Sequence, residues 1–467
     1  MDRQPRVGVV GGGVTGLAAA LRLRELLGPA AEIIVIEQRR ELGGKLHTGT
    51  LAGLVAEQGA EAFLLRQPGG SGDSAVVSLL HRLGLGDDLV HPAPVPPGLL
   101  LDGVLRPMPP GTLLGVPADP QQVAGIAPVT PGRDRDLGRP VLTPGADVAV
   151  GELVRQRFGD QVVDRLVDPM LGGVYAGRAD ALSLAATMPG LAAACATEST
   201  LAAAVKAAQA AAPRPSGAPV FGSLRGGLGR LVTALASAAK AQVLLGLPVR
   251  EMVPYGSGWQ LTVGATRHPR QVRLDAVILA LPARPACRLL AGIGGAAELA
   301  ALDYASVALI ILALPAIDLP DWSGFLVPAS EPLTIKAATF LTGKWPQLRR
   351  PGDPVLVRAS VGRFGEPGPL RLTDQALVRR VHAELSRVLR EEIGRPLPEP
   401  VASQVRRWGG ALPQYAPGHL DRVARARAAL PATVRLAGAG YDGVGIPACV
   451  RSGETAAEQL AAVLENE

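Results

Sequence analysis

Three spaced glycines stand near the start of the chain, between a short apolar run and a run rich in alanine and leucine. Glycines at this spacing, after a strand and before a helix, let backbone amides approach a pyrophosphate at the helix N-terminus, where the helix dipole also favours negative charge. The stretch therefore predicts a turn that binds a dinucleotide. It reads Gly11-Gly12-Gly13-Val14-Thr15-Gly16, and the three spaced glycines are Gly11, Gly13 and Gly16.

An acidic residue closes the next predicted strand, Glu32 to Glu37. The Glu37 carboxylate can accept hydrogen bonds from ribose hydroxyls but would repel a 2′-phosphate, so it disfavours NADP and leaves FAD and NAD. The doublet Gly43-Gly44 lies just beyond this strand. A doublet here lets a loop pass close beneath an extended dinucleotide, which plain nicotinamide dehydrogenases do not need. The doublet therefore favours FAD.

The C-terminal part also sets glycines between a strand and a helix, from Gly438 to Gly445. We expect the final helix to start near Ala448. In a fold whose chain returns to its first domain, the positive end of this helix would lie near a flavin ring and stabilise the electron-rich edge of the reduced ring. Both ends of the chain are therefore predicted to build one cofactor site.

These glycine stretches, together with Gln58-Gly59-Ala60-Glu61, resemble the FAD-dependent amine oxidase superfamily over the whole chain. Further stretches resemble one family within it, the oxygen-dependent protoporphyrinogen and coproporphyrinogen oxidases of haem synthesis. Lys344-Trp345 is similar to the bacterial, soluble branch, whose members in Gram-positive organisms act on coproporphyrinogen III. The further stretches are Gly172 to Gly177 with Leu182-Ser183, Leu224 to Leu228, Gly324 to Pro328, and Leu412 to Tyr415 with Gly418-His419.

The resemblance implies two sets of site residues. The cofactor-binding set is Gly11, Gly12, Gly13, Val14, Thr15, Gly16, Glu37, Gln38, Gly43, Gly44, Lys45, Gly59, Ala60, Glu61, Ala62, Val249, Trp408, Gly440, Val444, Gly445 and Ile446. The substrate-binding set is Gly173, Val174 and Tyr175 on one wall, Phe325 and Leu326 on the other, and Arg66 and Lys336 beside substrate carboxylates. Gln67 departs from the family, whose members tend to carry a second basic residue there. Without the resemblance, Tyr175, Phe325 and Leu326 would be assigned to a core, and Arg66 and Lys336 to the surface.

The chemistry that the resemblance implies is removal of a hydride from a meso carbon of a porphyrinogen, with the flavin N5 as acceptor. The protein then has to hold a flat apolar ring and exclude water, so no catalytic acid, base or nucleophile is required. Oxygen would reoxidise the flavin and give hydrogen peroxide, and three cycles would complete the aromatic macrocycle. The residues leave open a protoporphyrinogen substrate, another flavin amine oxidase or desaturase, and a non-catalytic porphyrin-binding flavoprotein.

The elements that must position these residues suggest an α/β protein, α+β overall. We expect a Rossmann-like FAD-binding domain over residues 1–78, 218–284 and 425–467, and a mixed-sheet substrate domain over 285–424 with part of 79–100. Residues 101–210 should form a helical subdomain, since the chain from 79 to 209 is mostly of helical pattern. A Pro/Gly-rich passage at 92–120 and a polar loop around 130–147 interrupt that pattern. Strand patterns at 243–247, 259–263, 276–281, 306–314 and 355–361 predict a second sheet. Residues 211–217 have the composition of a linker.

Composition limits the partners. The chain has 467 residues, 48% of them hydrophobic, and a formal net charge of +6 whose two signs are mixed along its length, so nucleic acid is not expected. Cys195, Cys287 and Cys449 have neither disulfide-framework nor metal-site spacing, which favours a reducing cytoplasm. The longest apolar run, Tyr304 to Ile317, is shorter than a membrane span and should be a buried strand. Peripheral membrane attachment, a ferrochelatase partner and the oligomeric state stay open.

Overall fold

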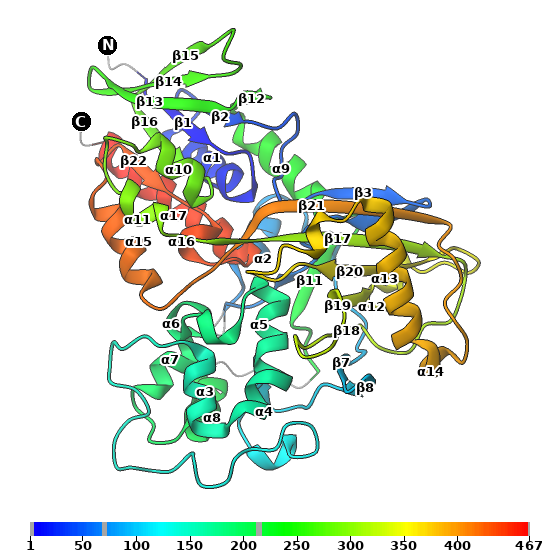
Figure 1. Cartoon of the computed structure of the whole chain (residues 1–467). Coiled ribbons are helices and arrows are strands. Elements are labelled where there is room, and N and C mark those ends of the chain that lie inside the picture. Colours follow the sequence, from blue (N-terminus) through cyan, green and yellow to red (C-terminus); the bar gives the residue numbers. More distant parts are fainter. Residues whose placement is uncertain (1–3, 68–71, 212–216, 466–467) are drawn as a thin grey trace.

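A five-stranded parallel sheet contains strands from both ends of the chain (Figure 1). The computed structural model describes residues 4–67, 72–211 and 217–465. The strand order is β12-β2-β1-β16-β22. Its strands read as continuous apolar runs because both faces of the sheet are covered. The bounds are β1 Arg6–Val10, β2 Glu32–Glu37, β12 Gln242–Leu245, β16 Ala276–Leu279 and β22 Val434–Leu436.

Helices cover one face of this sheet and a small antiparallel sheet covers the other. Val7, Val9 and Ile33 pack toward α1, α9 and α17, whereas Ile34 and Ile36 pack toward the second group. Alternate residues of each strand therefore belong to two different cores. The helices are α1 Val14–Leu27, α9 Gly229–Ala239 and α17 Ile446–Leu464, and the strands opposite are β13 Val249–Tyr255, β14 Gly258–Val263 and β15 Arg270–Leu274.

A second large sheet is mixed and has seven strands, in the order β21-β17-β20-β19-β18-β7-β8. Its pairs are antiparallel except β18 with β7, which is parallel. One face packs on α13 (Asp374–Val388) through an apolar core, and the other faces the parallel-sheet region. The strands are β7 Pro97–Leu101, β8 Val104–Pro107, β17 Tyr304–Leu314, β18 Gly324–Leu326, β19 Ile335–Phe340, β20 Val355–Val361 and β21 Ala402–Pro413.

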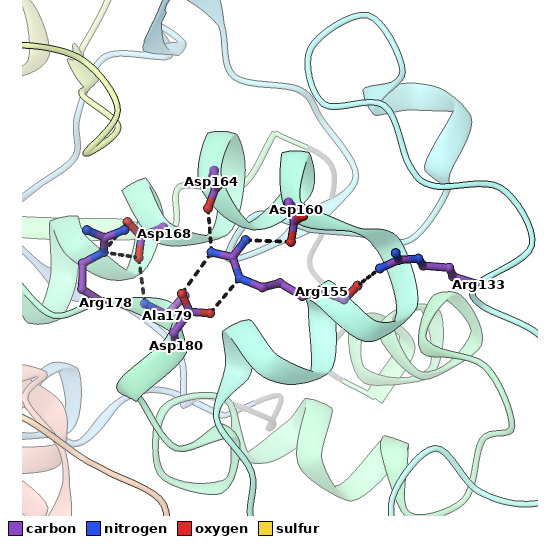
Figure 2. Close-up of polar contacts among 8 residues, drawn as sticks. All are labelled: Arg133, Arg155, Asp160, Asp164, Asp168, Arg178, Ala179 and Asp180. Carbon is purple, nitrogen blue, oxygen red and sulfur yellow. Dashed lines mark hydrogen bonds and ion pairs between the residues drawn. The ribbon is translucent and has the colours of Figure 1, made fainter.

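A helical region lies below both sheets in the view of Figure 1. A π-helical turn, Val163–Val167, joins α4 to α5, so the chain from 160 to 175 is one helix with a local irregularity. Arg155 ties three turns together by pairing with Asp160, Asp164 and Asp180 (Figure 2). The helices are α3 Val150–Phe158, α4 Asp160–Val162, α5 Asp168–Tyr175, α6 Leu184–Thr187, α7 Pro189–Cys195 and α8 Leu201–Ala211.

The remaining elements are short and connect these regions. The strands are β3 Thr48–Leu51, β4 Leu54–Glu57, β5 Phe63–Leu64, β6 Leu89–Val90, β9 Thr112–Leu113, β10 Val116–Pro117 and β11 Phe221–Leu224. The α-helices are α2 Ala75–Arg82, α10 Ala283–Leu289, α11 Ala296–Ala300, α12 Leu341–Lys344, α14 Arg390–Ile393, α15 His419–Ala428 and α16 Ala439–Asp442. The 3-10 turns are Gly86–Asp88, Pro120–Val123, Ala179–Ala181, Pro346–Leu348 and Pro369–Arg371. Over the described ranges, no helix has both the length and the apolar character of a membrane span.

The mixed α/β architecture and the buried strand within 304–317 are confirmed. The single second sheet is wrong: β12 and β16 join the parallel sheet, β14 joins the small one, and only β17 and β20 lie in the large one. The Pro/Gly-rich interruption of the helical pattern, between Pro92 and Pro120, contains four short strands, β7 to β10, that the sequence did not predict. Strand patterns identify strands but not their partners. The domain boundaries stay a prediction, and residues 212–216 of the linker lie outside the described residues.

Candidate active site

The turn between β1 and α1 contains two glycines at positions where any side chain would collide with the protein's own backbone. Gly11 has a φ of +114°, and a Cβ there would lie 2.3 Å from the Ala280 carbonyl oxygen. A Cβ on Gly16 would lie 1.9 Å from the Gly11 oxygen. On Gly13, by contrast, a Cβ would meet no protein atom nearer than 4.0 Å. Gly13 therefore leaves one side of the turn open, as close approach of a ligand to the backbone requires.

The carboxylate of Glu37 is fixed behind this turn. It is buried and accepts hydrogen bonds from the amides of Gly12, at 2.7 Å, and Arg39, at 2.8 Å. A carboxylate has room for further donors, so ribose hydroxyls can still be accepted. The neighbouring Gln38 is exposed, and Val249 begins β13, just after the Leu247 amide that donates to the Glu37 carbonyl oxygen at 3.0 Å.

The glycine doublet folds directly onto the turn. The Gly43 amide donates to the Gly12 carbonyl at 2.8 Å, and Gly43 and Gly44 have φ values of +107° and +59°. The side chain of the next residue, Lys45, is exposed to solvent, yet burial lowers its pKa. We call Gly11–Gly16, Glu37 and Gly43–Lys45 the nucleotide cradle.

The C-terminal turn lies beside the cradle. Helix α17 packs so tightly on α1 that a Cβ on Gly453 would lie 2.2 Å from the Thr15 carbonyl oxygen. At the helix start, Val444 is half-buried, Gly445 is exposed and Ile446 is buried, while a Cβ on Gly440 would lie 2.4 Å from the Tyr304 hydroxyl. The structure thus brings the predicted N-terminal and C-terminal residues together.

Glu61 connects the cradle side of the molecule to the seven-stranded sheet. It lies in the segment Gly59-Ala60-Glu61-Ala62 and pairs with Arg358 of β20 and Lys344 of α12. Burial by itself would raise the pKa of Glu61, but the two cations outweigh burial and lower it to about 2. The Arg358 guanidinium also donates to the Gly59 carbonyl, at 3.2 Å. Sequence reasoning missed Arg358, although a lone arginine in the apolar strand Val355–Val361 is a usable signal.

Trp408 of β21 contacts the same segment. Its indole N–H donates to the Gln58 carbonyl at 2.7 Å, and the ring is buried. The guanidinium carbons of Arg39 and Arg406 lie 5.1 and 4.9 Å from the ring centroid. Trp408 therefore contacts two cations, because the face of an indole ring attracts positive charge.

An apolar wall forms where α5 meets β18. A Cβ on Gly173 would lie 3.2 Å from a methyl group of Leu326, and the Val174 side chain is 41% exposed. We call Gly173, Val174 and Leu326 the apolar wall. Tyr175 lies behind it, 7% exposed, with its ring edge-on to Tyr415 at 5.7 Å between centroids.

Two other predicted substrate residues lie apart from the wall. Phe325 is buried on the α13 side of the sheet, with its ring centroid 6.1 Å from that of Phe340, because successive residues of a strand point to opposite faces. Arg66 is exposed, forms a β-bridge with Asp73 and lies by the β5–β11 pair. Their contact with substrate stays a prediction.

Lys336 of β19, unlike Arg66, is buried against the wall. Its ammonium donates to the Gly172 carbonyl oxygen at 3.0 Å, and only 4% of the residue is exposed. Burial, and then the positive charges of Arg363 and Arg358, lower the pKa of Lys336 to about 7. The structure therefore places one of the two predicted basic residues next to the wall.

The model of the flavin containing amine oxidoreductases matches residues 14–461 of this chain. This span runs from the first residue of α1 to Ala461 in α17. The chain belongs to the flavin-containing amine oxidoreductase family. The family explains why the C-terminal glycine turn, far away in sequence, lies beside the nucleotide cradle, and it makes the protein a flavin-dependent oxidase.

Several relatives within this family carry one name. The coproporphyrinogen III oxidase of Mycobacterium tuberculosis is 38% identical over 448 residues, which are 95% of this chain and 94% of that protein. The coproporphyrinogen III oxidase of Bacillus subtilis is 30% identical over 97% of both chains. The human protoporphyrinogen oxidase is 28% identical over 61% of this chain and 63% of that protein. The resemblance to porphyrinogen oxidases is thereby confirmed.

Solved structures agree with this family. A crystal structure of an Exiguobacterium protein, provisionally named a protoporphyrinogen oxidase, has a TM-score of 0.84 and 29% identity, covering 99% of both chains. A putrescine oxidase with bound putrescine has a TM-score of 0.68 at 19% identity, covering 98% of this chain and 99% of that chain. The second likeness concerns the fold alone.

Proposed function

We propose that this flavin-dependent oxidase converts coproporphyrinogen III to coproporphyrin III, with FAD as cofactor and oxygen as acceptor. The observation that carries the proposal is the 38% identity with the Mycobacterium tuberculosis coproporphyrinogen III oxidase along 95% of the chain. The shape of the site supports it, because the apolar wall suits a flat macrocycle and no catalytic triad is needed.

FAD fits the residues of the nucleotide cradle. Gly13 leaves room for a pyrophosphate, Glu37 can accept hydrogen bonds from a ribose, and the exposed Lys45 side chain adds positive charge next to the glycine doublet. The start of α17 adds a helix N-terminus, whose dipole stabilises negative charge. When bound, FAD supplies the hydride-accepting ring nitrogen. The Gly445 amide at the start of α17 would be one of the groups near that ring.

The protein's own contribution is to position the macrocycle and to keep water away. The apolar wall holds one face of the ring, and Tyr175 and Tyr415 support the wall from behind. Substrate carboxylates would bind basic residues at the edge of this wall. No side chain has to form a covalent bond with the substrate, so the reaction depends on orientation.

Protoporphyrinogen IX is the second candidate substrate, because the Exiguobacterium structure and the human relative carry that name. The two porphyrinogens differ where two propionates replace two vinyl groups. Steady-state oxidation of both in air, followed by porphyrin fluorescence and by peroxide formation, tests the proposal. We expect faster turnover of coproporphyrinogen III with one peroxide per cycle. Equal rates, or faster oxidation of protoporphyrinogen IX, would contradict the substrate assignment.

We also infer that the enzyme acts in the cytoplasm and passes its product to a ferrochelatase. The three widely spaced cysteines support a reducing compartment. Co-purification of the two enzymes, with release of coproporphyrin slowed when the ferrochelatase is absent, would support the partner. A release rate that is the same with and without ferrochelatase would contradict it.

A further inference from the structure

Lys336 is a buried cation without a carboxylate partner among the residues that the structure describes. Its ammonium donates to the Gly172 carbonyl oxygen at 3.0 Å. The charged groups that act on it are Arg363 and Arg358, and both are positive. A buried ammonium is costly unless it is paired, and one carbonyl at the end of a helix offsets only part of that cost.

Arg363, which follows β20, is a second cation that donates to a backbone carbonyl and has no ion-pair partner among the described residues. Its guanidinium donates to the Val327 carbonyl oxygen at 2.8 Å, and within the described part of the chain it forms no ion pair. Burial lowers its pKa. The charged groups around it are Glu366, Asp168, Arg178 and Glu384.

Glu366 is exposed to solvent and forms no ion pair with Arg363 among the described residues, and the other acidic groups near these two cations are engaged elsewhere. Asp168 pairs with Arg178 at 3.0 Å and accepts the Ala179 amide at 2.8 Å (Figure 2). Glu384 accepts the amides of Thr334 and Ile335 and pairs with Arg380. Glu61 compensates Arg358. The unpaired positive charge therefore remains on Lys336 and Arg363.

Both cations lie by the apolar wall. Lys336 contacts Gly172, the residue before Gly173, and the backbone next to Arg363 is tied to the same helix, since the Phe364 amide donates to the Ala176 carbonyl oxygen at 2.7 Å. Carboxylates are the natural partners of such a pair, and arginine holds them with two hydrogen bonds.

We propose that Lys336 and Arg363 bind a propionate carboxylate of the porphyrinogen, and that this binding draws a proton from solvent onto the Lys336 amine. The inference rests on the proposed function and adds to it the residues that read the substrate's carboxylates. In the free enzyme the pKa of Lys336 is about 7, so near neutral pH the amine is partly unprotonated. A bound carboxylate raises that pKa, and the amine gains a proton as it forms the ion pair.

The test is calorimetric titration of the holoenzyme with coproporphyrin III, the stable product, in two buffers with different ionisation enthalpies. At about one pH unit above the pKa of Lys336, we expect the uptake of about 0.9 proton per porphyrin, falling toward zero about one unit below it. Lys336→Met should abolish the uptake and weaken binding about tenfold, the typical effect of losing one charge-assisted hydrogen bond. The tetramethyl ester of coproporphyrin should bind both proteins equally.

Two further variants keep the test decisive. Lys336→Arg should bind within about threefold of the wild type but without proton uptake, because a guanidinium stays protonated. Arg379→Met, an exposed charge on α13, is the matched control and should change neither quantity. Undiminished uptake in Lys336→Met, or equal weakening of acid and ester, would overturn the inference. If the wild type fails to oxidise coproporphyrinogen III, the proposed function fails instead, and that assay is separate.

Discussion

In the nucleotide cradle, backbone groups make the decisive contacts: the Gly12 amide reaches the Glu37 carboxylate at 2.7 Å, and the Gly43 amide reaches the Gly12 carbonyl at 2.8 Å. Around the apolar wall, the decisive contacts are made by side chains from strands and helices that are distant in sequence. There Lys336 reaches Gly172, and Tyr175 packs on Tyr415. Backbone geometry is set by local sequence, whereas the wall depends on long-range assembly and on buried titratable groups.

This difference predicts different sensitivities. The cradle should respond to added volume, because its glycines approach other backbone atoms closely. The buried titratable groups outside the glycine turns should respond to pH and to loss of charge, because Glu61, Lys336 and His419 are buried with shifted pKa values.

The largest effect is expected for Glu61→Gln. It leaves Arg358 and Lys344 buried without a carboxylate, which should lower the free energy of unfolding by about 3–5 kcal/mol. The pKa of Glu61 is lowered from 4.5 to about 2, so its stabilisation is complete above about pH 4.5 and is lost as the pH falls toward 2. Urea unfolding across this range measures both. Glu41→Gln, at an exposed ion pair, is the control, and an equal loss in both variants would contradict the account.

The next largest effect concerns His419, which is buried and packs against Tyr415 with the ring centroids 4.4 Å apart and the ring planes tilted by 37°. Burial, and then Arg422, lower its pKa to about 4. An unfolded histidine binds a proton near pH 6.5, so the wild type should lose up to about 3 kcal/mol between about pH 6.5 and 4. His419→Phe should remove that slope and keep the slope of Glu61 at lower pH. Thermal unfolding at each pH measures these slopes. If the stability of His419→Phe depends on pH between 6.5 and 4 as the wild type does, the lowered pKa of His419 is refuted.

A matched pair of glycine variants tests the cradle. Gly16→Ala puts a Cβ 1.9 Å from the Gly11 oxygen and should cost about 1–3 kcal/mol of stability. Gly13→Ala has space and an extended backbone, with φ −77°, so the fold should keep its stability. We expect this variant to lose most of its flavin, because the methyl group occupies the open side of the turn. Absorbance and denaturant titration separate the two effects, and full flavin content in Gly13→Ala would contradict the cofactor position.

The smallest effect is expected in the helical region. Arg155 pairs with three aspartates, but their side chains are 45–72% exposed, so Arg155→Leu should cost only about 1 kcal/mol, less at high salt (Figure 2). Flavin content and the pH slopes should stay unchanged, since this cluster touches neither the cradle nor Glu61. A loss above that of Glu61→Gln would reverse the ranking of the two regions.

The sequence predicts the cradle better than the wall for a physical reason. The turn from Gly11 to Gly16, the strand ending at Glu37 and the doublet Gly43-Gly44 need local backbone conformations that only certain residues adopt. The partner of Glu61 could not be predicted in this way, because Arg358 is almost 300 residues away in sequence and reaches Glu61 only after the strands have paired.

The same reasoning explains how the predicted substrate residues are distributed in the fold. Phe325 and Leu326 are neighbours in sequence, yet the pleat of β18 turns one toward α13 and the other toward Gly173. Lys336 and Arg66 have the same charge, but only the bulged register between β19 and β20 places Lys336 beside the helix end. Neither orientation can be read without knowing which face of the sheet is covered.

The most direct test of the central claim is anaerobic mixing of the purified yellow protein with coproporphyrinogen III in a stopped-flow spectrometer. We predict bleaching of the flavin absorbance, followed by its return and by porphyrin fluorescence when air is admitted. A protein whose flavin is bleached by dithionite but not by coproporphyrinogen III, with no porphyrin appearing in air, would contradict the claim that the apolar wall presents a porphyrinogen to the flavin.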